Sequence, residues 1–409
     1  MSDVRPFRAH FYNQNIVGPL ERVVVPPFDV ISKKEKNFFF KKSPFNFARV
    51  ILGKNQGDGY KAVSQRLQKW KEKKVLILDS EPHYYVWEQS FLHGKQCLKR
   101  YSIAAIVAIS DYKKKKILPH EKTLLAPKLD RLKLIRACQA NLSPVFMMYD
   151  DPRYYLERKI IPKLKAPFLR FQDEEGVIFR IWKVDDFLLS NLIQKEFKKR
   201  KLYIVDGHHR FGASLMLSDL ERKNKDHPCH YAMSVITNMQ SKSLVVYPIY
   251  RLLKRTDKFN KEQYLTALSK HFIIRKRKGV SSLKRSQWGI LFRNDPSYYE
   301  VSLPREKRKT VIKTMKGHAL VKDLDVSILQ QVVVPQNLLE EIRYTRGMGN
   351  RLKEEILALK KGKYEALWMV KAPSVQELKQ IANVSEVMPA KSTFFYPKVF
   401  AGLLIRSFS

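Results

Sequence analysis

The stretch from residue 185 to residue 223 places a helix, a strand and a second helix in direct succession. Residues 185–201 carry apolar side chains at helical spacing, which we expect on one helix face: Phe187, Leu188, Leu192, Ile193 and Phe197. The apolar run at 202–205 predicts a buried strand, a turn follows it, and a helix is expected over 211–223. Helices and strands that alternate over such short stretches of sequence predict a mixed α/β (α+β) fold.

The rest of the chain continues this mixture without internal repeats. Helices are expected near 60–73, 130–140, 260–271, 323–334, 350–361 and 374–383. Strands are expected near 75–78, 84–91, 98–109, 145–149, 230–237, 287–293 and 298–303. The apolar pattern breaks near 251–259, which predicts two domains over residues 1–250 and 251–409. A chain of 409 residues is long enough for two such cores.

Composition excludes several classes of protein. The chain is 44% hydrophobic with only 15 Gly and 20 Pro, which excludes disordered and collagenous chains. No apolar run is long enough to span a membrane, and the first ten residues lack the apolar core of a signal peptide. The three cysteines form no CxxC pair, so neither a disulfide framework nor a zinc knuckle is expected. We therefore expect a cytoplasmic protein without a membrane partner.

The charge balance is unusual, with 78 basic and 39 acidic residues and a formal net charge of +39. Basic runs occur at 113–116, 198–201, 275–278 and 305–309. One interpretation is weak, sequence-independent binding of nucleic acid through its phosphates. The alternative is a lysine-rich composition on an ordinary fold, because no recognition helix or base-stacking motif accompanies the charge.

The strongest local signal is YIVDGHHRFGASLML at 203–217. An apolar strand ends at the turn of Asp206 and Gly207, and His208, His209 and Arg210 open a helix. A helix N-terminus offers unpaired N–H groups, and arginine can hold phosphate oxygens in a bidentate fork. This pattern indicates a phosphate or nucleotide site. A capped turn with half-exposed histidines is the structural alternative.

A second signal is LPHEKTLLAPKLDRLKLI at 118–135, where His120 and Glu121 precede a helix. Glu121 is a candidate general base, with His120 beside it as a catalytic candidate. The second histidine of HExxH is missing, so the zinc-protease motif is excluded. A surface loop explains the same residues equally well.

Two weaker signals remain. Asp29 lies in a proline-bounded turn within VVVPPFDVIS, where it is either catalytic or a turn acceptor. Lys391, Ser392 and Thr393 in MPAKSTFFYPK offer a cation and two hydroxyls for a phosphate. They do not form a P-loop, because the preceding glycines are missing.

Together these motifs resemble the domain of unknown function 1015 (DUF1015) family. The resemblance rests on PPFDVIS, PHEKT with APKLDRLKLIRACQANLSPVF, YIVDGHHRFGASL, LDVSILQ and MPAKSTFFYPKVFAGL, in that order. Phe28 and Phe211 stand where tyrosine is commoner in the family. Those differences remove hydroxyls and leave every proposed ionisable group in place.

The DGHHR segment also looks like the phosphate loop of the ParB and sulfiredoxin fold, and some relatives are archaeal free-serine kinases. The resemblance therefore implies a ParB/sulfiredoxin-like N-terminal part and a C-terminal α/β part that contributes MPAKSTFFYPK. It also implies a nucleotide, ATP or ADP with Mg²⁺, held by Asp206, Gly207, His208, His209 and Arg210. The metal ligands are unknown, although Asp29 is a candidate to hold the metal or a substrate amine.

Two functions from different classes follow. The first is a phosphotransferase acting on a small hydroxyl substrate such as serine, with Glu121 accepting the hydroxyl proton and His120 orienting it. The second is a nucleotide-regulated protein of ParB type that binds nucleic acid or another partner without catalysis. The oligomeric state is left open by the sequence.

Overall fold

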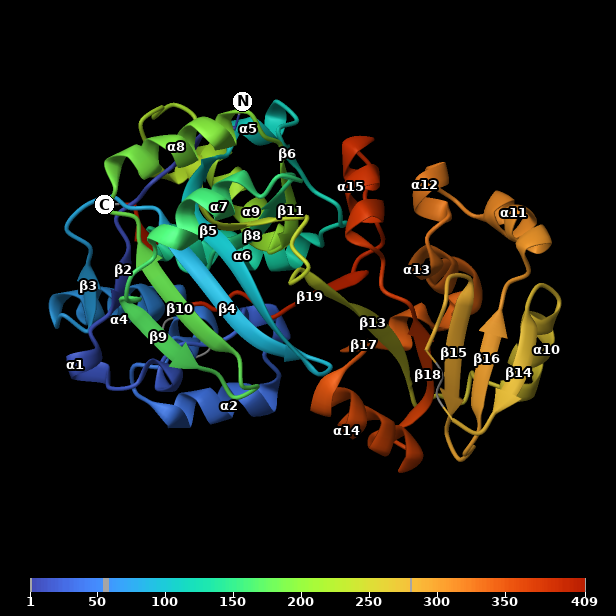
Figure 1. The fold of residues 1–409 in the computed structure, drawn as a ribbon. Helices are drawn as coiled ribbons and strands as arrows, with labels where there is room; N and C mark the ends of the chain where they lie inside the picture. The colour runs from blue at the N-terminus through green and yellow to red at the C-terminus, as the bar shows by residue number, and fades with distance from the viewer. Residues whose placement is uncertain (1, 54–58, 280–281, 409) are drawn as a thin grey trace. The chain divides into compact units, whose positions relative to one another are not determined.

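The computed structural model describes residues 2–53, 59–279 and 282–408, and these residues form two units. The first unit consists of Met1–Pro119, Thr123–Leu244 and Pro397–Ser409. The second consists of His120–Lys122 and Val245–Tyr396. Figure 1 shows helices and several sheets, so the predicted mixed α/β class is confirmed. None of the described helices is long and apolar enough to cross a bilayer.

Within the described residues, the first unit contains a nine-stranded mixed sheet. Its order is β6 (Ile117–Leu118), β11 (Leu202–Asp206), β8 (Val145–Tyr149), β12 (Tyr231–Asn238), β5 (Gln96–Ala108), β4 (Tyr85–His93), β10 (Ile178–Lys183) and β9 (Leu169–Gln172), with β1 (Val4–Arg5) paired to β5. The expected hairpin is the β4–β5 pair, whose register runs from Tyr85 opposite Ala104 to His93 opposite Gln96. β8 runs parallel to β12 and antiparallel to β11. The start of β8 therefore lies beside the end of β11.

Helices α7 (Tyr155–Ile160) and α8 (Phe187–Lys198) bury their apolar sides in one cluster with this sheet. The expected apolar face of α8 is partly wrong, because the helix buries Leu189, Ile193 and Phe197. Phe187 and Leu188 are exposed instead. Both lie in the first turn, directly after the N-cap residue Asp186. The buried set follows an i, i+4, i+8 spacing from Leu189.

Further helices of the first unit are α1 (Gln14–Val17), α2 (Lys33–Lys42), α3 (Ala48–Ile51), α4 (Tyr60–Glu72), α5 (Ser110–Lys113), α6 (Leu125–Cys138) and α9 (His208–Leu220). α6 and α9 share a small apolar cluster with Phe408, and this residue follows β20 (Arg406–Ser407). β20 pairs with β7 (Ala140–Asn141), and Ala401 bridges to Val25. The last residues of the chain are thus built into the first unit.

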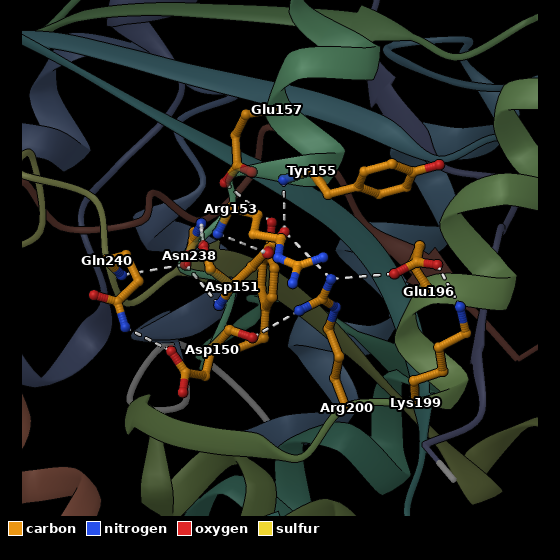
Figure 2. A network of polar contacts seen from close by, with 11 residues as sticks. Asp150, Asp151, Arg153, Tyr155, Glu157, Glu196, Lys199, Arg200, Asn238 and Gln240 are labelled. Atoms are coloured by element: carbon orange, nitrogen blue, oxygen red, sulfur yellow. Dashed lines mark hydrogen bonds and ion pairs between the residues drawn. The ribbon is translucent and has the colours of Figure 1, made fainter.

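A polar network joins the ends of β8 and β12, as Figure 2 shows. Asp151 accepts from the backbone N–H of Tyr155 at 2.8 Å, and its backbone exchanges two hydrogen bonds with the Asn238 side chain. Arg200, ahead of β11, pairs with Asp151 at 3.2 Å and Glu196 at 3.1 Å. This network fixes the start of α7 and the connection from α8 to β11.

The second unit contains a seven-stranded sheet among its described residues. Its order is β14 (Ile273–Arg277), β16 (Tyr298–Ser302), β15 (Gln287–Phe292), β18 (Tyr364–Val370), β13 (Val245–Lys254) and β17 (Ile342–Arg346), with β19 (Thr393–Tyr396) paired to β13. The described α-helices are α10 (Lys261–Ser269), α11 (Arg305–Thr314), α12 (Ala319–Lys322), α13 (Asp325–Ile328), α14 (Gly349–Lys360) and α15 (Val375–Asn383). The sequence boundary after residue 250 falls inside β13. Ser374 and Glu377 form the capping box that begins α15.

Candidate functional site

The DGHHR segment is a turn between a buried strand and a helix. β11 ends at Asp206, and α9 begins at His208 after a single residue, Gly207. Gly207 has φ +82°, a left-handed conformation that glycine adopts without steric cost. A Cβ atom at this position would also lie 2.8 Å from the Arg210 guanidinium. Glycine at this position therefore permits the left-handed turn and leaves room for the Arg210 side chain to pack against it.

Asp206 holds two cations at this turn. Its Oδ2 accepts from Arg210 at 2.7 Å, and its Oδ1 accepts from Lys398 Nζ at 2.6 Å. Arg210 also donates to the carbonyl of Pro144, and its Nε is buried without a hydrogen bond in the described part of the chain. Burial alone would raise the pKa of Asp206, but Lys398 and Arg210 bring that pKa below its usual value. The carboxylate is therefore charged at neutral pH.

The strand pair β4–β5 holds Lys398 in place. Gln89 on β4 donates to the carbonyl of Lys398 at 2.9 Å, and Arg100 on β5 donates to Gln89 and to the carbonyl of Pro397. The fully buried Arg100 guanidinium also lies 4.7 Å from the centre of the Phe146 ring. Burial lowers the pKa of Arg100 to about 9, and the charge of Asp206 opposes this shift.

We call Asp206, Arg210, Lys398 and Arg100 the Asp206 cluster. Its members are three cations and one carboxylate. An excess of buried positive charge is costly unless an anion compensates it. The cluster therefore gathers several positively charged hydrogen-bond donors at the turn between β11 and α9.

A pocket adjoins Arg210 on the side of the PPFDVIS segment. Its lining includes Phe28, Arg131, Ser143, Arg210 and Ser214, together with apolar residues such as Ile51, Leu134, Leu142 and Met233. Arg131 lies 4.1 Å from the centre of the Phe28 ring and pairs with the neighbouring Asp130. Three of the sequence motifs thus meet at one small pocket, with two arginines in an otherwise mostly apolar lining.

The other candidates of the first unit lie close to these elements. His208 and His209 are half-buried in the first turn of α9, and the charge of His208 also lowers the pKa of Asp206. Asp29 is exposed in the short 3-10 helix Phe28–Val30, next to the pocket residue Phe28. Within the described residues, His, Cys, Asp and Glu side chains form no group of three that could hold a metal ion.

The second unit brings together His120, Glu121 and the segment with Lys391, Ser392 and Thr393. Glu121 Oε1 accepts from the backbone N–H of Lys391 at 3.0 Å, and Glu121 bridges to Met388. The fully buried His120 places Nε2 3.3 Å from Thr393 Oγ1. Ser392 donates to the carbonyl of Pro389 at 2.6 Å. Glu121 thus holds the turn at 388–391 through a backbone hydrogen bond.

Arg251 is a further buried cation in the second unit. Its side chain on β13 is fully buried, and one of its nitrogens, Nη2, makes no hydrogen bond among the described residues. Burial lowers the pKa of Arg251 to about 10, and the negative charge of Glu121 opposes this shift. Gln330, from the LDVSILQ motif, lies 3.4 Å from Arg251 Nε.

Sequence reasoning missed Arg100, Lys398 and Arg251. Arg251 and Lys398 are each flanked by apolar residues, whereas Arg100 directly follows Lys99. A basic residue inside an otherwise apolar run is the signal that could have found Arg251 and Lys398, since burial of such a charge requires a reason. Arg100 carries no such signal in the sequence.

A protein-family model matches the part of the chain that contains most of these features. The model of the family described as "Protein of unknown function (DUF1015)" matches residues 4–327. The chain belongs to the DUF1015 family. The match includes the PPFDVIS, PHEKT and DGHHR motifs of this DUF1015 protein and ends before MPAKSTFFYPK. A comparison with curated proteins found no match.

Solved structures align with the DUF1015 chain at low identity. A conserved hypothetical protein from Pyrococcus furiosus is 15% identical, with 72% of this chain and 92% of that chain covered and a TM-score of 0.34. A free serine kinase in complex with AMP is also 15% identical, with 71% and 86% covered and a TM-score of 0.35. C-terminally truncated SbnI from Staphylococcus aureus is 9% identical, with 74% and 87% covered and a TM-score of 0.37.

Proposed function

We propose that this protein is a small-molecule phosphotransferase that binds nucleotide phosphates at the turn between β11 and α9. The observation that carries the proposal is the pair of buried cations, Arg210 and Lys398, that share Asp206 at the start of a helix. The first-turn N–H groups of α9 add further donors for an anion. Such transfers depend on positioning and on neutralising phosphate charge, which these groups supply.

In this proposal a bound phosphate group accepts some of the hydrogen bonds that Asp206 accepts in the free protein. Asp206 keeps Arg210 and Lys398 ordered in the free protein, and a phosphate with more than one negative charge competes for the same donors. Arg210 Nε is a buried donor without a hydrogen bond among the described residues, so it gains an acceptor when the ligand binds. Ligand binding then removes an unsatisfied group.

The finer assignments rest on the resemblance of the motifs. We propose ATP or ADP as the nucleotide, with Mg²⁺ bound to its phosphates, and a free hydroxy amino acid such as serine as the second substrate. Mg²⁺ commonly uses one or two carboxylates together with substrate phosphates, and Asp29 is the carboxylate that we assign to it. His208 and His209 are assigned to phosphate binding, as are Lys391, Ser392 and Thr393. Glu121 is assigned as general base and His120 as its orienting partner.

Calorimetric titration with ADP tests the anion site. Lys398→Ala and Arg210→Ala should each weaken binding by about 1.5–3 kcal/mol, the scale of a hydrogen bond to a charged group. Lys183→Ala is the matched control, because Lys183 also pairs with a buried carboxylate, Asp79, at 2.7 Å in the same unit. Equal affinity in all four proteins, with intact melting curves, would show that the Asp206 cluster does not bind nucleotide.

Turnover is tested separately by incubating the protein with serine, Mg²⁺ and either ATP or ADP. Mass spectrometry should detect phosphoserine, and Lys398→Ala should reduce its rate of formation. Nucleotide binding without any phosphorylated product, across a panel of hydroxy amino acids, would leave the anion site but reject the transfer reaction.

A further inference from the structure

Two basic segments of the second unit combine into one surface, which we call the basic edge. It consists of residues 270–278, around strand β14, and residues 305–316, around helix α11. The two segments contain eleven basic residues and one acidic residue, Glu306. The proposal below concerns this surface alone and does not depend on the phosphotransferase activity.

Most of these charges are exposed and have no acidic partner. Arg277 pairs with Glu300, and the half-buried Arg308 pairs with Asp323 and Asp325. The remaining nine are exposed and form no salt bridge within the described residues: Lys270, Arg275, Lys276, Lys278, Arg305, Lys307, Lys309, Lys313 and Lys316. Elsewhere in the chain, exposed lysines such as Lys113 and Lys163 do pair with carboxylates.

The two segments are neighbours in space. Lys307 Nζ at the start of α11 donates to the carbonyl of Lys270 at 3.3 Å, just before β14. Phe272 and Val311 are buried in the same apolar cluster, which anchors both segments to one core. β14 is the outermost strand of its sheet, with β16 as its single partner in the described sheet order (Figure 1). The start of α11 therefore lies beside the residue that leads into β14.

Charged side chains on an edge strand can have a simpler purpose. They prevent another strand from adding to the free edge, and β14 needs such protection. That role accounts for the charges at 275–278 but not for those of α11, because a helix has no free strand edge to protect. Lysines clustered on both elements instead indicate binding of a polyanion.

We propose that the basic edge binds the phosphate backbone of double-stranded nucleic acid without sequence preference. A five-residue strand such as β14 is about 17 Å long, and a duplex presents roughly ten phosphate charges along that length. Single-strand binding normally uses aromatic side chains that stack on bases. The sole Phe, Tyr or Trp in either segment is Phe272, which is buried. The surface thus offers charge without a stacking platform.

The test uses a fluorescent duplex of about 20 base pairs and measures affinity by anisotropy between about 50 mM and about 200 mM salt. The test variant carries Lys276→Gln, Lys278→Gln, Lys307→Gln and Lys309→Gln. The control carries Lys33→Gln, Lys34→Gln, Lys41→Gln and Lys114→Gln, which are also exposed and remove the same charge from the first unit. Circular dichroism melting verifies that both variants remain folded.

We expect the test variant to lose at least tenfold in affinity at the lower salt concentration. The slope of log affinity against log salt should fall by up to about 3.6, or about 0.9 for each lost phosphate contact. The control should keep a slope close to that of the unmodified protein. A double variant, Lys276→Gln with Lys307→Gln, should show about half the change in slope.

Four outcomes would overturn the proposal. One is equal loss in the test and control variants, which means that net charge rather than the basic edge controls binding. Another is tighter binding of a single strand than of the duplex. The third is tighter binding of anionic vesicles than of the duplex, which would assign the surface to a membrane. Self-association of the test variant, with unchanged duplex affinity, would leave edge protection as the sole role of these lysines.

Discussion

Asp206 compensates two buried cations, so removing its charge should affect stability as well as binding. Breaking a buried ion pair by removing one partner typically costs about 3–5 kcal/mol. We expect Asp206→Asn to lower the free energy of unfolding by this amount at neutral pH. The folded-state pKa of Asp206 is lowered, so its stabilising effect is complete above the unfolded pKa of about 4.

That effect is lost as pH falls through the folded pKa. Urea unfolding of the unmodified protein and of the Asp206→Asn variant across a pH series measures this dependence. The difference in stability between the two proteins should persist from neutral pH to about pH 4 and shrink at lower pH. A difference that is constant down to the most acidic samples would mean that the carboxylate charge is not what stabilises the turn.

Gly207 provides a second residue-scale prediction. Gly207→Ala places a side chain at φ +82° and a Cβ 2.8 Å from the Arg210 guanidinium. The backbone strain alone costs about 1–2 kcal/mol, and Arg210 must move. We expect a lower melting temperature and weaker ADP binding. Gly176→Ala is a control with the same φ of +82° but its nearest atom 3.7 Å away, so it should lose stability without weakening ADP binding.

A variant of Glu121 distinguishes two roles for this residue: stabilising its loop through a hydrogen bond, and acting as a general base. Its Oε1 accepts from Lys391 N–H at 3.0 Å, and glutamine keeps an oxygen for that bond. If Glu121 is the base, Glu121→Gln should reduce turnover by roughly a hundredfold to ten-thousandfold with ligand-induced stabilisation unchanged. Glu121→Ala should in addition lose about 1 kcal/mol of stability. An unchanged rate in the glutamine variant means that Glu121 only fastens the loop.

At the scale of elements, the sequence predicts helices and strands better than it predicts which side of a helix packs against the sheet. The strand at 202–205, the turn at Asp206 and the following helix are all present, as β11 and α9. These features depend on neighbours in sequence, so a periodic pattern reveals them. The buried face of α8 depends on which side of the helix packs against the sheet. The apolar residues near its capped end do not reveal that side. β17 and β18 were missed. β18 is buried at every position, and a short buried run cannot be assigned to a strand or a helix from periodicity alone.

Helix α7 carries an element-scale prediction about pH. Glu157 on α7 is half-buried, one of its oxygens has no hydrogen bond within the described residues, and Tyr149 donates to the other at 3.0 Å. Burial raises its pKa. Its contribution to stability is therefore complete below the unfolded pKa and is lost as pH rises through the folded pKa.

We expect Glu157→Gln to raise the melting temperature at neutral pH and to have less effect near pH 4, because glutamine remains neutral and can still accept from Tyr149. Melting curves across a pH series measure this change. A variant that is less stable than the original at every pH would show that the charged carboxylate contributes favourably to the network of Figure 2.

At the scale of the whole molecule, the sequence could not predict that the residues after 396 pack into the first unit. Asp206 and Arg210 are four residues apart, so a helical turn brings them together. Asp206 and Lys398 are separated by 192 positions, and no periodicity connects them. The sequence therefore indicated the phosphate turn but not its second cation, and it favoured Lys391 within the same segment.

A chain that ends at residue 396 tests how much the first unit depends on this return. It loses Lys398 and the buried residues Val399, Ala401, Leu403, Leu404 and Ile405. Each buried Val, Leu or Ile contributes about 1.5–3 kcal/mol, so the shortened chain should melt at least 10 °C lower or fail to fold. Circular dichroism melting measures this loss. An unchanged melting curve, with ADP binding retained, would show that the first unit is complete without these residues.

The return of residues 397–409 also sets an order of events during translation. The ribosome must synthesise all of the second unit, which takes roughly 10–30 s, before the residues that complete the first unit emerge. During that interval the nascent chain exposes the apolar surface that Val399, Leu403 and Ile405 will cover. We infer that the Asp206 cluster forms only after residue 398 has left the exit tunnel, so an incomplete nascent chain has no assembled anion site.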